Sequence, residues 1–286
     1  MLLKRPFQNN IKFISSNEIS DIQNSDLIIV CVGLFASAEE KAKYKTSDKT
    51  GRNIQSFKNY PLIKQIAQEI KKYALHSNVL MITNQSDMMS ELARTILPKQ
   101  NVYGVGCYLD TLRFKKIFSQ LTHSPFEAIK ATILGFHDQS MFLDKSSFSC
   151  LYPFNQTKDI IQTALHQTIL RGKELSDMQK DIHHPSINSG SSKLPAAALF
   201  NIVESYTQKN TPLCIPLNRV LCNEEKERYE LDFSFGAQLM CQITHKEIKP
   251  IPTQLNISDI NLLKQGLRDF EQNFNSFNIT YFDINR

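Results

Sequence analysis

The sequence lacks the patterns that would indicate a membrane, secreted or nucleic-acid-binding protein. No apolar stretch approaches the length of a membrane span, and the MLLKRPFQNN start has no signal-peptide core. The 33 lysines and arginines are scattered and form no dense run interleaved with aromatic residues, so a net charge of +5 does not predict a nucleic-acid surface. We expect no membrane partner and no nucleic-acid partner.

The six cysteines form no CxxC pair and no cluster with histidine at the spacing of metal ligands. Several lie inside apolar runs such as DLIIVCVG, which is typical of buried, reduced thiols in a cytosolic protein. We therefore predict no metal site and a cytoplasmic location.

Apolar runs alternate with amphipathic segments in the first half of the chain. Residues 26–32, 78–83 and 102–106 are predicted strands. Helices are predicted between them, from near Pro61 onwards and over 88–97. This alternation predicts a parallel α/β sheet whose strands are buried on both faces.

The second half has a different pattern. Helices are predicted around 158–170 and 195–206, and consecutive strands, as in an antiparallel meander, at 213–220, 228–235 and 238–244. A last helix begins near Ser258, and its apolar face carries Leu263, Leu267, Phe270 and Phe274. A parallel α/β half followed by an α+β half predicts two units.

Four short segments carry polar residues at positions suited to chemistry. They read ITNQSD (82–87), LDTLRF (109–114), LGFHDQS (134–140) and GRNIQSFKNYPLIK (51–64). Each has an ordinary structural explanation by itself. An Asp three residues before an Arg is usually a helix ion pair, and an Asn at a strand end is usually turn chemistry.

Together these segments supply the groups of an acid/base site. His137 is the side chain that exchanges a proton most readily near neutral pH, and an Asp bonded to it would fix its tautomer and raise its pKa. Asp110 and Arg113 lie one helical turn apart, and an Arg can bind a carboxylate through two parallel hydrogen bonds. A second Arg on a mobile loop can polarise a carbonyl. This is the set of groups needed to move hydride to or from a 2-hydroxy acid.

The LDxxRF, TN-x-x-D and LGxHxxS strings resemble those of the L-lactate/malate dehydrogenase family. The intervals also look like family spacing: 32 positions from Arg52 to Asn84, 3 from Asp110 to Arg113, and 27 from Asp110 to His137. The resemblance is strongest over 26–140. It implies an α/β fold with an incomplete Rossmann-like sheet, a partial NAD-binding domain at 1–112, and an α+β substrate domain of the lactate/malate dehydrogenase type at 113–286.

The resemblance also implies a role for each matching residue on the substrate side. His137 would be the proton donor and acceptor, with Asp110 as its partner. Arg113 would bind the substrate carboxylate, Arg52 would polarise the substrate carbonyl, and Ser192 would face the substrate.

On the cofactor side, the resemblance implies NAD. Asn84 would contact both the substrate and the nicotinamide, and Gly33 and Asn59 would line the dinucleotide. The substrate would be a small 2-hydroxy or 2-oxo acid, and the protein would assemble as a homo-oligomer, a dimer or tetramer.

Several positions depart from the family pattern. Gln85 stands where relatives have Pro, Asp138 where they have Gly, and Phe136 where Glu is common. A carboxylate beside His137 could raise the pKa of that histidine or repel an anionic substrate.

The largest departure is the missing glycine-rich phosphate loop. A Rossmann half opens with GxGxxG after its first strand, but the only glycine before residue 50 is Gly33. Gly104 and Gly106 form a lone GxG without a third glycine. A strand–helix–strand unit of roughly 30 residues is therefore expected to be missing. The alternatives are a truncated, non-catalytic relative that acts as a subunit or binding partner, and a binding module that uses the basic loop at 35–51.

Overall fold

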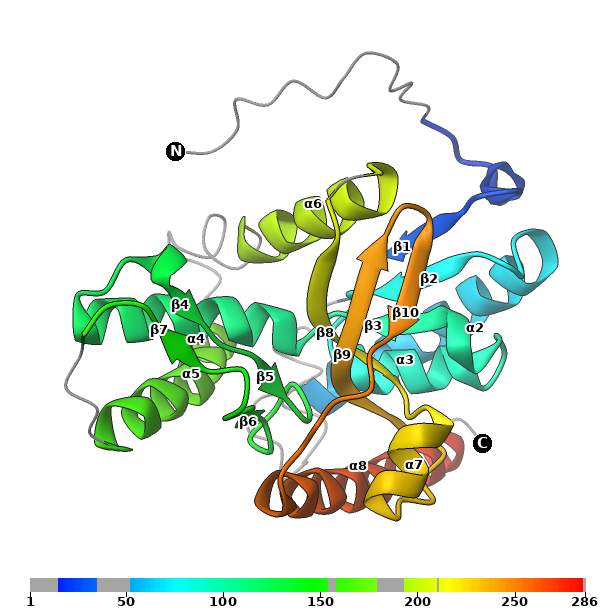
Figure 1. The fold of residues 1–286 in the computed structure, drawn as a ribbon. Coiled ribbons are helices and arrows are strands. Elements are labelled where there is room, and N and C mark those ends of the chain that lie inside the picture. Colours follow the sequence, from blue (N-terminus) through cyan, green and yellow to red (C-terminus); the bar gives the residue numbers. More distant parts are fainter. Residues whose placement is uncertain (1–14, 35–51, 154–157, 179–192, 210, 285–286) are drawn as a thin grey trace.

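Six strands from both halves of the sequence form one mixed sheet in the computed structural model, in the order β1-β2-β3-β8-β9-β10 (Figure 1). The structure describes residues 15–34, 52–153, 158–178, 193–209 and 211–284. The parallel strands are β1 (Leu27–Val30), β2 (Asn78–Met81) and β3 (Val102–Gly104). The antiparallel strands are β8 (Leu213–Val220), β9 (Gly236–Thr244) and β10 (Glu247–Pro250).

Helices connect the strands and extend beyond the sheet. They are α2 (Arg52–Tyr73), α3 (Ser86–Arg94), α4 (Cys107–Thr122), α5 (Lys158–Met178), α6 (Lys193–Thr207), α7 (Asn223–Tyr229) and α8 (Ile257–Ile284). The short 3-10 helices are Ile19–Ile22, Lys99–Asn101 and Phe126–Ala128. Within the described residues, no helix is both long enough and apolar enough to cross a membrane.

The predicted α/β class is confirmed, and the strands of the two predicted units share a sheet. β3 meets β8 at a single antiparallel pair, Gly104 with Asn218. The boundary between two domains at 112/113 stays a prediction. The pairing of β3 with β8 brings residues from far along the chain to the ends of the parallel strands.

A hydrophobic core covers each face of the sheet. On one face α2, α3 and α8 pack together through residues such as Ile63, Met89 and Leu267. On the other face α6 packs on the sheet, and Ile202 of α6 and Leu217 of β8 belong to the same apolar core. Burial of these apolar side chains is the main force that holds the helices on the sheet.

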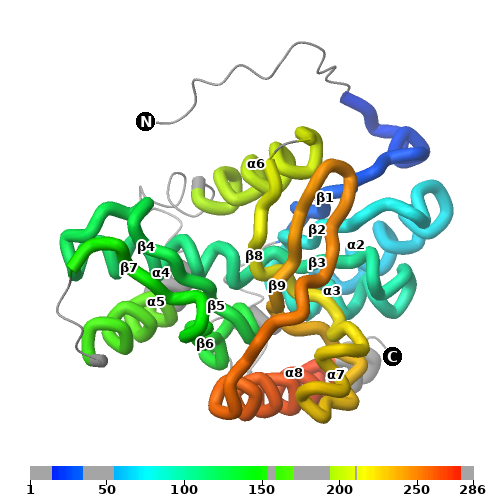
Figure 2. Tube along the Cα trace, in the orientation of Figure 1, coloured from blue at the N-terminus to red at the C-terminus, as the bar shows by residue number. Residues whose placement is uncertain are grey.

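A second lobe lies to one side of the sheet, as the green segments of Figure 2 show. It contains most of α4, α5 and two small hairpin-like sheets, formed by β4 (Ile129–Lys130) with β7 (Ser149–Cys150), and by β5 (Ile133–Leu134) with β6 (Phe142–Leu143). Its own core includes Phe114 and Phe118. Because α4 starts at the end of β3 and runs into this lobe, it connects the lobe directly to the sheet.

Two predicted elements were wrong. The expected strand at 228–235 is replaced by α7 and an irregular segment, because Glu225 accepts a hydrogen bond from the main-chain N–H of Cys222 at 3.1 Å and so caps a helix. The helix expected near Pro61 begins at Arg52 instead, with Pro61 inside it. Phe57, in the earlier turns of α2, stacks on Phe277 of α8, and this tertiary contact stabilises the longer helix.

The last helix was predicted correctly. α8 begins at Ile257, and the four residues of its predicted apolar face are all buried: Leu263, Leu267, Phe270 and Phe274. The basic loop at 35–51 lies outside the described residues.

Candidate active site

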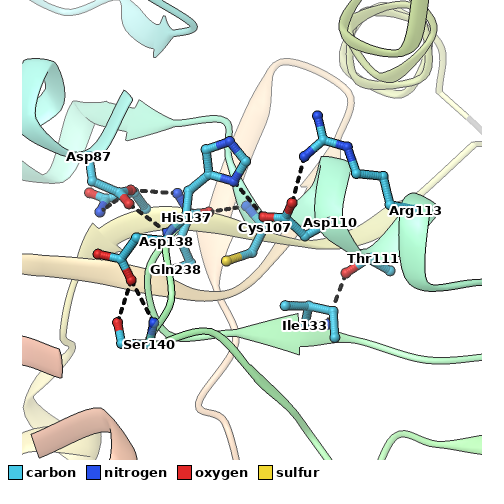
Figure 3. A network of polar contacts seen from close by, with 11 residues as sticks. Asp87, Cys107, Asp110, Thr111, Arg113, Ile133, His137, Asp138, Ser140 and Gln238 are labelled. Carbon is cyan, nitrogen blue, oxygen red and sulfur yellow. Dashed lines mark hydrogen bonds and ion pairs between the residues drawn. The ribbon is translucent and has the colours of Figure 1, made fainter. Parts of the chain in front are cut away.

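His137, Asp110 and Arg113 come together where β3 passes into α4 (Figure 3). Asp110 and Arg113 lie in the first turns of α4, and His137 follows β5. One oxygen of Asp110, Oδ2, contacts His137 Nδ1, and the other, Oδ1, accepts a 2.8 Å hydrogen bond from Arg113 Nη1. The carboxylate therefore orients both the histidine ring and the guanidinium.

The three side chains differ in exposure. The side chain of Asp110 is 1% exposed, that of Arg113 is 15% exposed and that of His137 is 27% exposed. The carboxylate is thus hidden, while the histidine and the arginine reach solvent. Because Nδ1 of His137 faces Asp110, Nε2 is the ring nitrogen directed away from it.

Charge coupling shifts both members of the pair toward their charged forms. Burial acts to raise the pKa of Asp110, but His137 and then Arg113 lower it below its ordinary value. Burial acts to lower the pKa of His137, but Asp110 raises it above its ordinary value of 6.5. This arrangement favours an imidazolium beside a carboxylate.

The lone GxG of the sequence packs against this site. A Cβ added to Gly106 would lie 2.8 Å from Cβ of His137 and 2.6 Å from Nε2 of Gln238. A Cβ added to Gly104 would lie 2.9 Å from Cβ of Asn218. Gly106 lets the start of α4 approach the histidine, and Gly104 lets β3 approach Asn218 of β8. Both uses differ from cradling a phosphate.

The turn that carries His137 has its own requirement for glycine. Gly135 has φ +99°, which side chains rarely tolerate, and an added Cβ would lie 2.9 Å from the main-chain oxygen of Ser140. Asp138 accepts hydrogen bonds from the N–H and hydroxyl of Ser140, at 2.7 and 2.6 Å, so its carboxylate closes this turn. Phe136 is buried and stacks on Phe270 of α8, with ring centroids 5.1 Å apart.

The three candidate cofactor residues meet at the carboxyl ends of β1 and β2. Asn59 of α2 accepts a 2.7 Å hydrogen bond from the N–H of Leu34 and donates at 3.4 Å to the main-chain oxygen of Asn84. Its Nδ2 would lie 3.9 Å from a Cβ added to Gly33. Asn59 is buried, whereas Gly33 and Asn84 are exposed. Asn59 therefore links Leu34, next to Gly33, to the main chain of Asn84. Contact of Gly33, Asn59 and Asn84 with a cofactor stays a prediction.

Two of the predicted substrate residues cannot be placed as side chains. Arg52 is the first residue of α2, but its side chain lies outside the described part of the structure. Ser192 also lies outside the described residues. In the ranges that the structure covers, no group of three or more His, Cys, Asp or Glu side chains could hold a metal ion.

Asp87 was not among the predicted site residues. Its Oδ2 accepts a 2.9 Å hydrogen bond from the main-chain N–H of His137, and its Oδ1 accepts from Asn218 at 2.8 Å and from Gln238 at 2.6 Å. Asp87 is the last residue of ITNQSD, and the TN-x-x-D string was the signal that could have found it. No local pattern marks Asn218 or Gln238, which lie 131 and 151 positions further along the chain.

These features define a class of protein: an α/β fold of the Rossmann type with a His–Asp–Arg cluster, His137, Asp110 and Arg113, at the carboxyl ends of its parallel strands. Known proteins share the fold. No protein-family model matches the sequence. The malate dehydrogenase of Chlorobium chlorochromatii is 29% identical over 134 residues, which cover 46% of this chain and 39% of that protein.

Solved structures share the fold over nearly the whole chain. The malate dehydrogenase of Plasmodium falciparum aligns with a TM-score of 0.74 at 19% identity, covering 97% of this chain and 82% of that one. The lactate dehydrogenase of Cryptosporidium parvum aligns with a TM-score of 0.71 at 21% identity, covering 93% and 79%. Sequence and fold together support membership of the L-lactate/malate dehydrogenase family, as the three motifs predicted. The sequence match spans only about two fifths of the curated relative, 39% of its length.

Proposed function

We propose that this chain carries the acid/base and substrate side of an NAD-dependent dehydrogenase that interconverts a 2-hydroxy acid and a 2-oxo acid. The substrate pair is L-lactate/pyruvate or malate/oxaloacetate. The observation that carries the proposal is the Asp110 carboxylate, which touches His137 through one oxygen and Arg113 through the other.

His137 moves the proton in this reaction. When a 2-oxo acid is reduced, the imidazolium donates its proton from Nε2 to the carbonyl oxygen; in the reverse direction, neutral His137 accepts the hydroxyl proton. Asp110 holds Nδ1 and stabilises the imidazolium, as the raised pKa of His137 indicates. The orientation of the ring thus leaves one nitrogen for the substrate.

Arg113 and Arg52 are the proposed contacts of the substrate anion. Arg113 has its Nη1 on Asp110, and its planar fork suits the carboxylate that every 2-hydroxy acid carries. Arg52, at the start of α2, would polarise the carbonyl, and Ser192 would face the substrate.

The residues at the carboxyl ends of β1 and β2 fit the nicotinamide end of NAD. Gly33 and Asn84 are exposed there. Among the described residues, the atom nearest to a Cβ added to Gly33 is 3.9 Å away, so this part of the structure leaves room for a flat ring to approach the main chain. Open α/β sheets bind dinucleotides at this edge. When bound, NAD supplies or accepts the hydride. The Cryptosporidium parvum lactate dehydrogenase structure is described as complexed with lactic acid and nicotinamide adenine dinucleotide, which supports this choice of cofactor.

The test is NADH oxidation by the 286-residue chain with pyruvate or oxaloacetate, compared with the His137→Asn variant. We expect the variant to lose at least roughly 100-fold in kcat, because it lacks the general acid. NADH binding, followed by fluorescence titration, should stay nearly unchanged. Equal turnover of both proteins would reject the role of His137.

The second candidate function is a non-catalytic relative that acts as a subunit or binding partner. It is favoured by the lack of a GxGxxG segment in the 286 residues, and for that reason we expect this chain to bind little or no NADH. Absence of turnover at saturating NADH, with an intact fold by circular dichroism, would support it over the enzyme.

We also propose that the protein is a homo-oligomer and that it lies in the cytoplasm. Sedimentation velocity tests the oligomeric state, and cell fractionation tests the location.

A further inference from the structure

A buried carboxylate, Asp87, lies behind the proposed active site and is surrounded by hydrogen-bond donors (Figure 3). The residue is 8% exposed and lies in the first turn of α3. Its three donors come from three different segments: the main chain of His137, the side chain of Asn218 in β8 and the side chain of Gln238 in β9. Such convergence suits a group that only accepts hydrogen bonds, which is an ionised carboxylate.

Neighbouring obligate donors dictate which way the two amides face. Oε1 of Gln238 accepts a 3.2 Å hydrogen bond from the main-chain N–H of Cys107, so its Nε2 must face Asp87. Oδ1 of Asn218 accepts a 2.6 Å hydrogen bond from Arg94, so its Nδ2 must also face Asp87. Neither amide can turn an oxygen toward the carboxylate without placing its NH₂ group against another donor.

A buried ion pair holds Asn218 from the far side. Arg94 pairs with Glu91 at 2.6 Å and also donates to the main-chain oxygen of Asn218 at 2.8 Å. Glu91 additionally accepts from the N–H of Gly236, at the start of β9. The environment of Asp87 is therefore built from residues that are themselves fixed, which limits its movement.

Gln238 connects this environment to both parts of the acid/base pair. Its main chain exchanges hydrogen bonds with Gly135, two residues before His137, at 2.8 and 3.1 Å. Its side chain bonds to the N–H of Cys107, three residues before Asp110 on α4. A single residue of β9 thus fixes the histidine turn and the helix of its partner relative to each other.

We infer that Asp87 is a second carboxylate of the acid/base site, a positioning residue that holds the main chain of His137 while Asp110 holds its ring. Gln238 and Asn218 keep Asp87 in place. The inference rests on the proposed function for its catalytic meaning, but the geometry concerns this chain's residues alone. Because the main chain and Nδ1 of His137 are both held, Nε2 points in one direction, toward the proposed substrate position.

The charges around His137 indicate what Asp87 contributes besides position. From α4 the ring faces the charged groups of Asp110 and Arg113. The thiol of Cys107, at the start of the same helix, stays neutral because burial raises its pKa. From α3 it faces Asp87, which also acts to raise the pKa of His137. In its own turn, Asp138 bonds to Ser140.

The first test is an NMR titration of the wild-type chain, which needs neither substrate nor NADH. The main-chain N–H of His137 donates to Asp87, so its proton shift should report the ionisation of that carboxylate. Burial raises the pKa of Asp87, against the lowering effect of the donors, so we expect an inflection above its ordinary value of 3.8. An amide shift that follows only the ring of His137 would overturn the inference.

The second test compares three variants in the same titration. Asp87→Asn should abolish the amide inflection and move the ring titration of His137 to lower pH, by roughly half a pH unit or more, because a nearby negative charge is lost. Gln238→Met keeps the Asp87 carboxylate and removes one of its donors, so the inflection of the His137 amide should persist but move to higher pH. This variant provides the test if Asp87→Asn does not fold.

Asp138→Asn is the matched control, since it removes a carboxylate next to His137 in sequence that bonds to Ser140 instead. It should keep the amide inflection. A ring titration that is unchanged in folded Asp87→Asn, or an inflection lost in Asp138→Asn, would overturn the inference. Turnover is measured separately: a wild-type chain without turnover but with the expected titrations would refute the proposed function alone.

Discussion

Arg113 donates a 2.8 Å hydrogen bond to Asp110, so the arginine proposed to bind substrate is held by the carboxylate that orients the histidine. The two proposed roles, carboxylate binding and acid/base catalysis, therefore depend on one buried side chain. A substrate bound by Arg113 would be placed beside His137 by the same contact that fixes the ring.

The first prediction concerns the geometry of this arginine. Arg113→Lys keeps the positive charge but loses the planar fork, so KM for the 2-oxo acid should rise, by about 100-fold, with a smaller change in kcat. Steady-state kinetics with varied oxo acid measures the effect. Lys116→Gln, which alters an exposed cation on the same helix, should leave KM within about twofold. Similar KM values for Arg113→Lys and wild type would contradict the proposed carboxylate contact.

The second prediction is the pH dependence of reduction. Reduction requires protonated His137, so kcat/KM for the oxo acid should be high at low pH and fall as pH rises through the pKa of His137. Asp110 raises that pKa, so the fall should be centred above 6.5. In Asp110→Asn the descending limb should move to lower pH. A limb that stays in place in Asp110→Asn would show that another group controls it.

The third prediction concerns the glycine that touches the histidine. Gly106→Ala places a Cβ 2.8 Å from Cβ of His137 and 2.6 Å from Nε2 of Gln238, so the turn and the helix must separate. We expect a loss in kcat of about 100-fold, since small misplacements of catalytic groups have effects of this size. Stopped-flow or steady-state NADH oxidation measures kcat, and circular dichroism shows whether the fold is kept. Wild-type kcat in Gly106→Ala would mean that this packing does not position His137.

The fourth prediction concerns a buried ion pair away from the site. Arg219 donates to both oxygens of Glu225, at 2.7 and 2.8 Å, and both side chains are buried. Burial acts to raise the pKa of Glu225, but Arg219 lowers it, so the carboxylate is ionised. Glu225→Gln leaves a buried guanidinium without its counter-ion and should lower the free energy of unfolding by about 3–5 kcal/mol.

The control for this measurement is the neighbouring pair on α7. Glu224 and Arg228 are 2.6 Å apart, but their side chains are 55% and 41% exposed. Glu224→Gln should change the free energy of unfolding by less than about 1 kcal/mol, because solvent screens exposed pairs. Urea unfolding of both variants gives the comparison, and equal effects would contradict the assigned difference in burial.

Much of the fold could be predicted because its signals are local. The apolar run at 26–32 and the NVLMIT string at 78–83 predicted buried parallel strands, and the periodic apolar residues of α8 predicted its buried face. Alternation of polar and apolar residues at 228–235 predicted a strand wrongly. There, the capping contact of Glu225 and its pair with Arg219 stabilise a helix instead.

The amino-acid sequence by itself determined which residues could carry acid/base chemistry, because the family motifs preserve the intervals between Asp110, Arg113 and His137. Only the tertiary structure decided what surrounds them. Asn218 and Gln238 reach Asp87 across 131 and 151 positions, because β8 pairs with the last parallel strand and β9 pairs with β8. Contacts of that range depend on how strands associate, and no local pattern of residues encodes them.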